Sequence, residues 1–460
     1  MENKHKISAG ELWYGLPLLI FIGFAIFAPV GIYNDTAQYI GMHIHRDSLY
    51  CLWLLLLRTI TGGAEWYLNI AVWAQNLFAG FSVIYLTKVV KREFGLTKLV
   101  TVLVCVLAMA PHLMTPIAAS SHLILTNSIM SESITYPLFY IFVAHLIRMT
   151  REYSGKSKWY ALLFATLLSF ARGQMMVMML VWLVVTIYMI IVTRRQIIVR
   201  ILAMCLIFGM VFALRSVVIK SYNLIFNRYY TGPTMSTVSL LTNIVYASDE
   251  DAVTLVGDTE AAGFLGQTLK AADGLQYNYK YAPEGFMGRA LDLEEKHDRI
   301  KFECIDELWR PIHDMFYPEL QNDYELETIE QDRIAGVIIK KIWPKCFGTW
   351  LYDYLGLATC GFIRTVAFVH PIINVYAALV YLLLIAGVIV LWNNKKDRAD
   401  NIRLIRLGLL TVLTVCANVL GTASVIMCLS RYMVYTLPLV YISVILIWIK
   451  IVQRFKDPCQ

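Results

Sequence analysis

Long apolar segments, separated by short polar ones, make up most of the chain. A membrane-spanning helix needs about 20 mainly apolar residues, and segments of roughly that length recur. They cover about residues 12–33, 66–87, 97–114, 124–147, 159–171, 174–193, 200–218, 366–392, 404–428 and 433–449. The pattern predicts an all-α polytopic membrane protein with about ten transmembrane helices.

The first outer connection, residues 34–65, is not simply a loop. It contains the apolar run Leu49–Leu57, which is too short to span a bilayer and is flanked by charged residues. Such a run predicts a helix that lies in the membrane interface. The segment 159–171 is also short, and it reads as half of a tight helical pair that turns at Arg172-Gly173.

Residues 219–365 are the one stretch long enough for a folded polar domain. Acidic residues outnumber basic ones there, and helical periodicity in its second half predicts a small, mostly helical domain. Its start, 227–258, is rich in Gly, Thr and Ser and predicts a long loop. The membrane regions on either side are 1–218 and 366–460.

Lysine and arginine gather in every second connection, which is the pattern of cytoplasmic loops. The clusters lie at residues 4–6, 88–98, 148–158, 194–200, 395–406 and 450–456. We therefore expect a multi-pass protein of the cell membrane with both termini in the cytoplasm. Residues 34–65 and 219–365 would then be extracytoplasmic.

The composition agrees with this topology and excludes several function classes. Apolar residues make up 58% of the chain and charged residues 16%, against about a quarter charged in soluble domains. The net charge of +7 comes from the basic clusters, so we expect no nucleic-acid partner. The nine cysteines lack metal-ligand spacing, and nucleotide, metalloprotease and hydrolase motifs are absent. No cofactor is predicted firmly, and a divalent cation is left open.

Asp35 stands where the first apolar segment ends. Asp35, Gln38 and Tyr39 have the spacing i, i+3, i+4, so on a helix they share one face. A carboxylate beside a bilayer costs free energy, so it is expected to be solvated, to form an ion pair or to have a functional role. Asp35 is therefore a candidate general base or metal ligand. Alternatively, it is the N-cap of a helix that begins at Thr36.

Glu132 and Arg172 lie at the expected outer ends of later segments. Glu132 belongs to a run, Thr126–Pro137, that is rich in hydroxyl side chains. It is either an acid facing a hydrated cavity or a first-turn glutamate favoured by the helix dipole. Arg172 either grips a phosphate or extends to the interface as a turn residue.

Arg431 and Arg364 add positive charge on the same side. Arg431 lies at the turn of the last hairpin, and Arg364 directly precedes the segment 366–392. Each has the same two interpretations as Arg172. His43 follows Tyr39 by four residues, but a lone histidine is more often hydrogen-bonded or exposed than a ligand, so no metal site is predicted from it.

Taken together, these features resemble the GT-C glycosyltransferases, integral membrane enzymes that use polyprenyl-phosphate-linked sugars. The resemblance covers most of the membrane region and little of 225–360. It rests on the large outer loop, the interfacial segment of the first outer loop, and the runs Tyr33–Tyr39, Ser131–Leu138, Phe170–Gln174 and Arg431-Tyr432 before Leu-Pro-Leu.

The resemblance implies a GT-C-like fold and roles for the candidate residues. Asp35 would be catalytic or bind a metal ion. Many members have a second acid beside it, where this chain has Asn34, so Glu132 would supply that acid. The site for the lipid phosphate would comprise Arg172, Arg364, Arg431, Tyr39 and His43.

The implied reaction moves a sugar from a polyprenyl-phosphate donor to a glycan, glycolipid or protein acceptor, as in cell-envelope polysaccharide biosynthesis. Other classes stay open. A transporter or flippase for lipid-linked glycans would also place charges in a membrane cavity, although the chain lacks the internal repeat typical of transporters. An oligosaccharide ligase or polymerase would carry a similar outer loop. In a structural or sensory membrane protein the polar residues would be interface residues.

Overall fold

The computed structural model describes residues 13–118, 124–151, 155–194, 196–318, 323–394 and 397–456. These residues are almost entirely helical, and their one β contact is an isolated bridge between Gly31 and Ser128. Five basic residues used to predict the orientation lie outside the described ranges: Lys4, Lys6, Arg195, Lys395 and Lys396.

Six of the described helical stretches are long and apolar enough to cross a membrane. They are α4 (Tyr67–Phe94), η3 with α8 (Gly173–Thr193), α9 (Ile197–Asn227), α15 (Pro371–Asn393), α16 (Arg398–Ala423) and α17 with α18 (Ser430–Arg454). The other expected spans are shorter or less apolar helices: α1 (Leu16–Phe27), α5 (Lys98–Ala118), α6 (Glu132–Arg151) and α7 (Ser157–Ala171). The fold is consistent with a helical membrane protein, and the count of ten stays a prediction.

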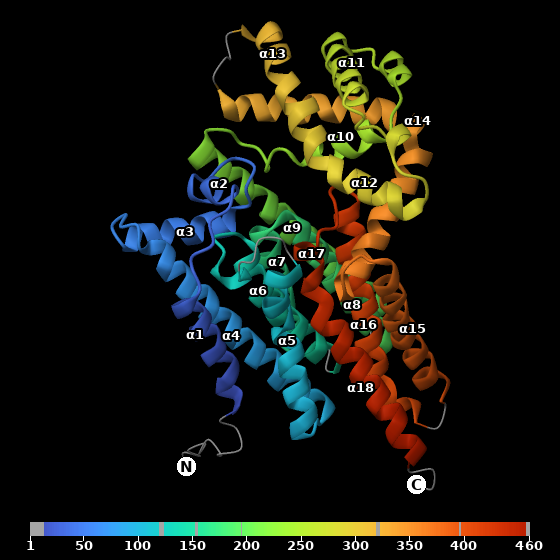
Figure 1. Cartoon of the computed structure of the whole chain (residues 1–460). Helices are drawn as coiled ribbons and strands as arrows, with labels where there is room; N and C mark the ends of the chain where they lie inside the picture. Colours follow the sequence, from blue (N-terminus) through green and yellow to red (C-terminus); the bar gives the residue numbers. More distant parts are fainter. Residues whose placement is uncertain are drawn as a thin grey trace.

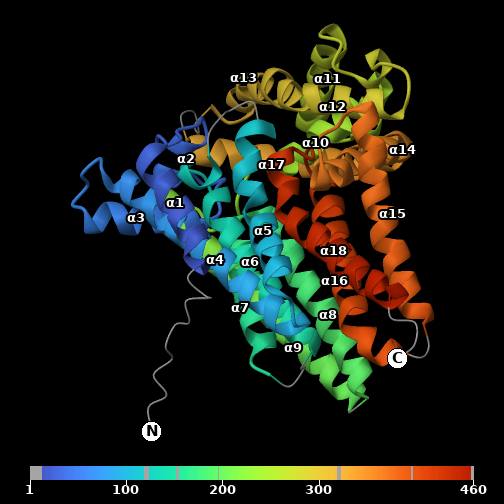
Figure 2. The same cartoon turned by 60° about the horizontal axis from the view of Figure 1, so that its bottom comes forward.

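The helices pack in two groups that lie side by side (Figure 2). In the first, α1 packs on α4, α4 on α6, α6 on α7, and α7 on α8. The second contains α15, α16 and α18 (Leu437–Lys456), and it meets the first where α16 packs on α8 and α18 on α5. The start of α1 and the end of α18 lie at the same end of the bundle (Figure 1).

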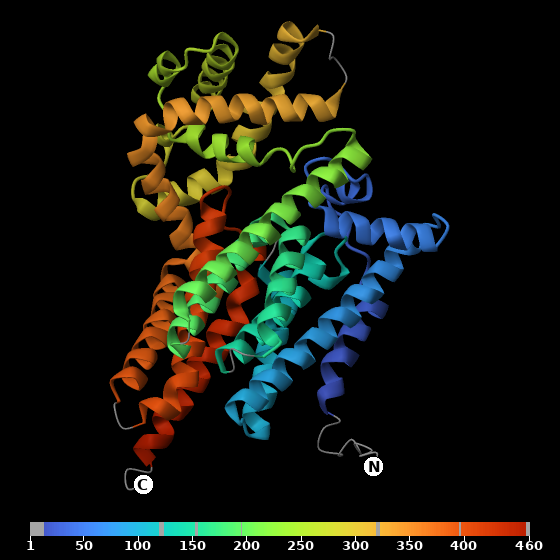
Figure 3. The same cartoon turned by 180° about the vertical axis from the view of Figure 1, so that it is seen from behind.

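Helix α9 runs along the back of the bundle (Figure 3) and is hardly covered by protein. Of the 18 consecutive residues that form the most apolar part of α9, only 6% are buried. Leu202 and Leu206 are 64% and 65% exposed. A continuous apolar surface of this kind is unfavourable in water. The exposed face of α9 is thus suited to an apolar surrounding.

The first outer connection contains α2 (Thr36–Ile40) and α3 (Ser48–Ile60). α3 lies across the end of the bundle rather than along it (Figure 1). It packs on α4 and α7 through a stripe that includes Tyr50 and Leu54, and it leaves Leu56 and Ile60 exposed. A short helix is therefore present over Leu49–Leu57, as the sequence predicts.

The domain at this end is built from α10 (Ser236–Tyr246), α11 (Thr259–Gly274), α12 (Phe286–Arg299), the π-helical segment η6 (Ile300–Asp306), α13 (Glu307–Phe316) and the first part of α14 (Tyr324–Val366). The long loop predicted over 227–258 is wrong. α10 forms there because Val238, Leu241 and Val245 lie on one face and are buried in the core of the domain.

Helix α14 joins this domain to the bundle. It has 43 residues, and it lies along the domain before turning down beside the second helix group (Figures 1 and 3). Pro344 lies inside α14. Proline cannot donate the backbone hydrogen bond to the preceding turn, so it accounts for the bend.

Candidate functional site

Glu132 and Arg172 form a buried ion pair at the end of the first helix group that lies nearer the domain. Arg172 Nη1 lies 2.6 Å from Glu132 Oε1, and the two side chains are 15% and 2% exposed. Glu132 is the first residue of α6, and Arg172 ends α7 in an extended conformation. The two charges depend on each other, because a buried charge without its partner is very costly.

Arg431 brings a second cation to this pair. Its Nε lies 4.0 Å from Glu132 Oε1, and it donates from Nη2 to the Tyr432 hydroxyl at 2.8 Å. The guanidinium groups of Arg172 and Arg431 lie 4.3 and 4.9 Å from the centre of the Tyr432 ring. Two arginines and one glutamate give these three side chains a net charge of +1. We call Glu132, Arg172, Arg431 and Tyr432 the arginine cluster.

The turn that carries Arg172 is fixed by contacts on both sides. Arg172 Nε donates to Gln174 Oε1 at 3.1 Å, and Gln174 Nε2 donates to Thr422 Oγ1 of α16 at 2.7 Å. The backbone N–H of Gly173 donates to Asp47 Oδ2 at 2.5 Å. Burial raises the pKa of Asp47, and the neighbouring Arg215 works against that rise. These contacts hold Arg172 in one position.

Tyr39 links the first outer connection to the arginine cluster. Its hydroxyl lies 3.0 Å from the Oγ of Ser131, the residue before Glu132. Burial, and then the charge of Glu132, raise the pKa of Tyr39 to about 12. Tyr39 therefore remains a neutral hydroxyl at physiological pH.

Asp35, Gln38 and Tyr39 share one face, as their spacing predicts, and Arg46 covers it. Arg46 Nη2 lies 2.7 Å from Asp35 Oδ1, its Nε donates to Gln38 Oε1 at 2.8 Å, and its guanidinium lies 4.8 Å from the centre of the Tyr39 ring. Asp35 occupies the N-cap position of α2, but its side chain makes no capping hydrogen bond. The N-cap interpretation is therefore right about the position, since the helix begins at Thr36, but the carboxylate pairs with Arg46 instead of capping the helix.

Arg364 and His43 lie apart from the arginine cluster. Arg364 forms an ion pair with Glu294 of α12 and donates to the carbonyl of Cys428 at 3.0 Å. The His43 ring lies 6.1 Å from that of Tyr324 at the start of α14, so it faces the domain. The structure brings Arg172 and Arg431 together and places Arg364 against Glu294, and the expected role of Arg364 at the lipid phosphate stays a prediction.

Sequence reasoning did not single out Arg46 or Lys301. Arg46 is one of the charged residues that flank the apolar run Leu49–Leu57. Lys301 lies in η6, within electrostatic range of Arg46 and Asp298, and burial lowers its pKa. Asp298 in turn lies within range of Arg431. The end of α12 thus lies near Arg431 and the π-helical turn near Arg46, and π-helical turns often occur at functional sites.

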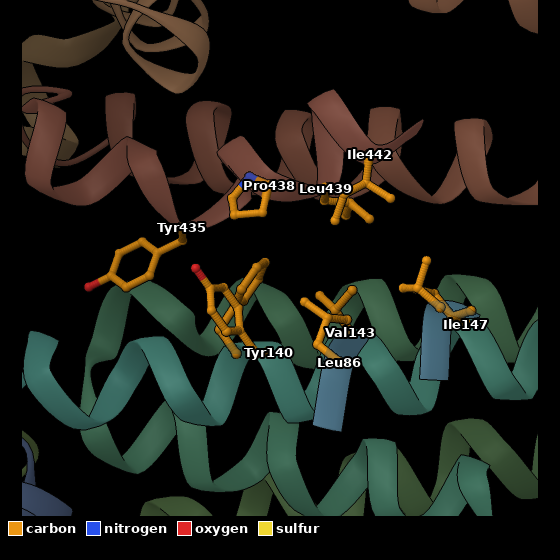
Figure 4. A pocket seen from close by; sticks show the side chains of 10 residues that line it. Leu86, Tyr140, Val143, Ile147, Tyr435, Pro438, Leu439 and Ile442 are labelled. Carbon is orange, nitrogen blue, oxygen red and sulfur yellow. The ribbon is translucent and has the colours of Figure 1, made fainter. Parts of the chain in front are cut away.

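An apolar seam leads from the arginine cluster along the bundle. The Tyr435 ring packs at a tilt against that of Tyr136, with ring centres 4.1 Å apart. Pro438, Leu439 and Ile442 follow along α18 and face α6 (Figure 4). The seam encloses about 10 Å³, so it holds no ligand unless α18 and α6 move apart. It is lined by Leu86, Val90, Phe139, Tyr140, Val143, Ile147, Tyr435, Pro438, Leu439 and Ile442.

Among the described residues, no three His, Cys, Asp or Glu side chains lie close enough together to hold a metal ion. Comparison with known proteins gives no further guide: no family model, curated protein or solved structure matches this chain. The function has to be argued from the chemistry of the site.

Proposed function

We propose that this protein is a GT-C-type glycosyltransferase. It would transfer a sugar from a polyprenyl-phosphate donor to a glycan, glycolipid or protein acceptor on the extracytoplasmic face of a membrane. The observation that carries the proposal is the buried arginine cluster with its net positive charge, linked through Tyr39 and Arg46 to the partly exposed carboxylate of Asp35.

The arginine cluster has the chemistry to bind a phosphate. One of its buried donor atoms, Arg431 Nε, has no hydrogen-bond partner among the described residues, and neither has the nearby Tyr435 hydroxyl. Phosphate oxygens are strong acceptors for such donors. Positive charge fixed in a buried site also stabilises the charge that develops on a leaving phosphate.

Asp35 is placed to act on the other reactant. It is 35% exposed, and Arg46 contacts Oδ1, while Oδ2 makes no hydrogen bond within the described ranges. As the acceptor hydroxyl attacks the anomeric carbon, Asp35 takes its proton, and the bond from that carbon to the phosphate oxygen breaks. Glu132 is engaged by Arg172 and would position it.

The surroundings suit these reactants. The polyprenyl tail would lie in the membrane beside the apolar seam, which would widen to admit it. The acceptor would approach beneath the domain, where Arg46 and Lys301 face the site. Both reactants then meet at the end of the bundle that carries the domain.

The test uses protein reconstituted in vesicles with a panel of labelled polyprenyl-phosphate sugars and a cell-envelope extract as acceptor. We expect release of polyprenyl phosphate with transfer of label, and the Asp35→Asn variant should lower the turnover by about 100- to 10,000-fold. Asp251→Asn changes a 65% exposed carboxylate of the outer domain and should leave the turnover unchanged.

Equal turnover in Asp35→Asn and Asp251→Asn would reject the role of Asp35. If the intact donor crosses the bilayer with no release of polyprenyl phosphate, the protein is a transporter and the proposal is wrong.

A further inference from the structure

A polar cavity of about 550 Å³ lies at the opposite end of the bundle from the domain. It is formed by the end of α4, the end of α6 and the start of α7. Its lining residues are Arg92, Glu93, Arg148, Arg151, Gly155, Lys156, Ser157 and Tyr160. Four basic side chains and one acidic one give the lining a net charge of +3.

The single acid in this lining is already neutralised. Glu93 is 5% exposed, and its two carboxylate oxygens lie 3.0 Å from Arg92 Nη2 and 3.2 Å from Arg151 Nη1. Arg148 donates to the Tyr85 hydroxyl at 3.2 Å. Neither Arg148 nor Lys156 has a carboxylate partner within the described ranges. The cavity therefore offers positive charge that no carboxylate among the described residues compensates.

The residues beside the cavity indicate where it lies relative to the membrane. Trp159, Tyr160 and Leu163, at the start of α7, are 43%, 46% and 49% exposed. Exposed tryptophan and tyrosine next to basic residues are typical of the level of the lipid headgroups. The cavity would thus open among headgroups, on the side that the basic loops predict to be cytoplasmic.

We propose that this cavity binds the phosphate group of an anionic phospholipid from the surrounding leaflet. Basic pockets between helices at this side of a membrane are suited to anionic headgroups, because the headgroup charge replaces the missing carboxylate partners. The site lies at the far end of the bundle from Asp35 and the arginine cluster, so it does not depend on the proposed glycosyltransferase activity.

The test compares two double variants that remove the same charge. Arg148→Gln/Lys156→Gln removes the two cavity cations without a carboxylate partner. Lys88→Gln/Arg194→Gln removes two exposed cations outside the cavity lining. Each protein is taken from vesicles of phosphatidylcholine, alone or mixed with phosphatidylglycerol, and the retained lipid is measured by native mass spectrometry.

We expect phosphatidylglycerol to be retained by the wild-type protein and by the Lys88/Arg194 variant. The Arg148/Lys156 variant should bind it about 30-fold more weakly, since each Lys or Arg near an anionic membrane contributes roughly fivefold. The charge-conserving variant Arg148→Lys/Lys156→Arg should restore binding, which separates charge from folding.

Equal retention in both double variants would overturn the proposal, and so would equal retention of phosphatidylcholine. A further arm adds inorganic phosphate to the detergent-solubilised protein. If inorganic phosphate displaces the retained lipid at low concentration, the cavity is a site for a soluble anion and the lipid assignment is wrong.

Discussion

At the scale of single residues, the candidate site depends on which charges find partners. The topology predicted from the sequence places Glu132, Arg172 and Arg364 toward the same side of the membrane, but it does not reveal which charges form ion pairs. Glu132 and Arg172 meet because α6 packs on α7, whereas Arg364 is taken by Glu294 of α12. The shared face of Asp35 and Tyr39 was predictable because it depends on local spacing alone. Their contact with Arg46 depends on the turn after α2.

The buried pair of Glu132 and Arg172 gives a prediction about stability. Glu132→Ala leaves Arg172 buried without its carboxylate, which should destabilise the protein by about 3–5 kcal/mol. The double variant Glu132→Leu/Arg172→Met removes both charges and should recover most of that loss. The measurement is the unfolding temperature in detergent of the wild-type protein, the single variant and the double variant.

The same double variant separates stability from function, since it should fold yet fail to release polyprenyl phosphate. If the single and double variants unfold at the same temperature, the two charges are not coupled in the way the structure indicates.

At the scale of helices, apolar periodicity locates most of the helices. It does not predict features that depend on how the helices pack against one another. The sequence predicts α3 and α8, because their apolar runs are long or clearly bounded. It misses α10, whose buried Val238 and Leu241 lie among Thr and Ser residues. It also ends the outer domain at 365, whereas α14 continues from the domain into the bundle, where Gly361 packs on α16.

Two glycines of α14 give a matched test of this packing. A Cβ at Gly361 would lie 2.8 Å from Val419 Cγ1 and 3.0 Å from Cys428 Sγ, whereas a Cβ at Gly348 would meet nothing within 4 Å. We expect Gly361→Ala to destabilise the protein by about 1–3 kcal/mol through overpacking. Gly348→Ala should stabilise it slightly, by up to about 1 kcal/mol, because alanine favours the helix.

The readout is the unfolding temperature of each variant in detergent. If Gly361→Ala and Gly348→Ala are equally stable, α14 and α16 are not in the close contact described here.

At the scale of the whole molecule, the distribution of charge and the shape both distinguish one end of the bundle from the other. The domain lies at one end of the bundle, and the start of α1 and the end of α18 lie at the other (Figure 1). The distribution of Lys and Arg predicts this arrangement without knowledge of any contact. It does not predict how far α9 is left uncovered, because that depends on which helices pack beside it.

Chemical labelling of intact cells tests the orientation. A cysteine introduced by Asp298→Cys, at a 63% exposed position of the domain, should react with a membrane-impermeant maleimide from outside. A cysteine introduced by Gln453→Cys, at an exposed position near the end of α18, should react only after permeabilisation. Both variants are made with Cys205 and Cys459 replaced by Ser, because Cys205 is exposed and Cys459 lies close to position 453 in the sequence. The reverse labelling pattern would invert the topology.

The bend in α14 gives the molecule a mechanical property. One continuous helix belongs both to the domain and to the bundle, where it contacts α17, the short helix that carries Arg431. At Pro344 the backbone lacks a hydrogen bond, so bending there costs less than elsewhere in the helix. Pro344 is therefore the point at which α14 bends most easily. The angle between the part in the domain and the part that contacts α17 can change there without distorting the rest of the helix.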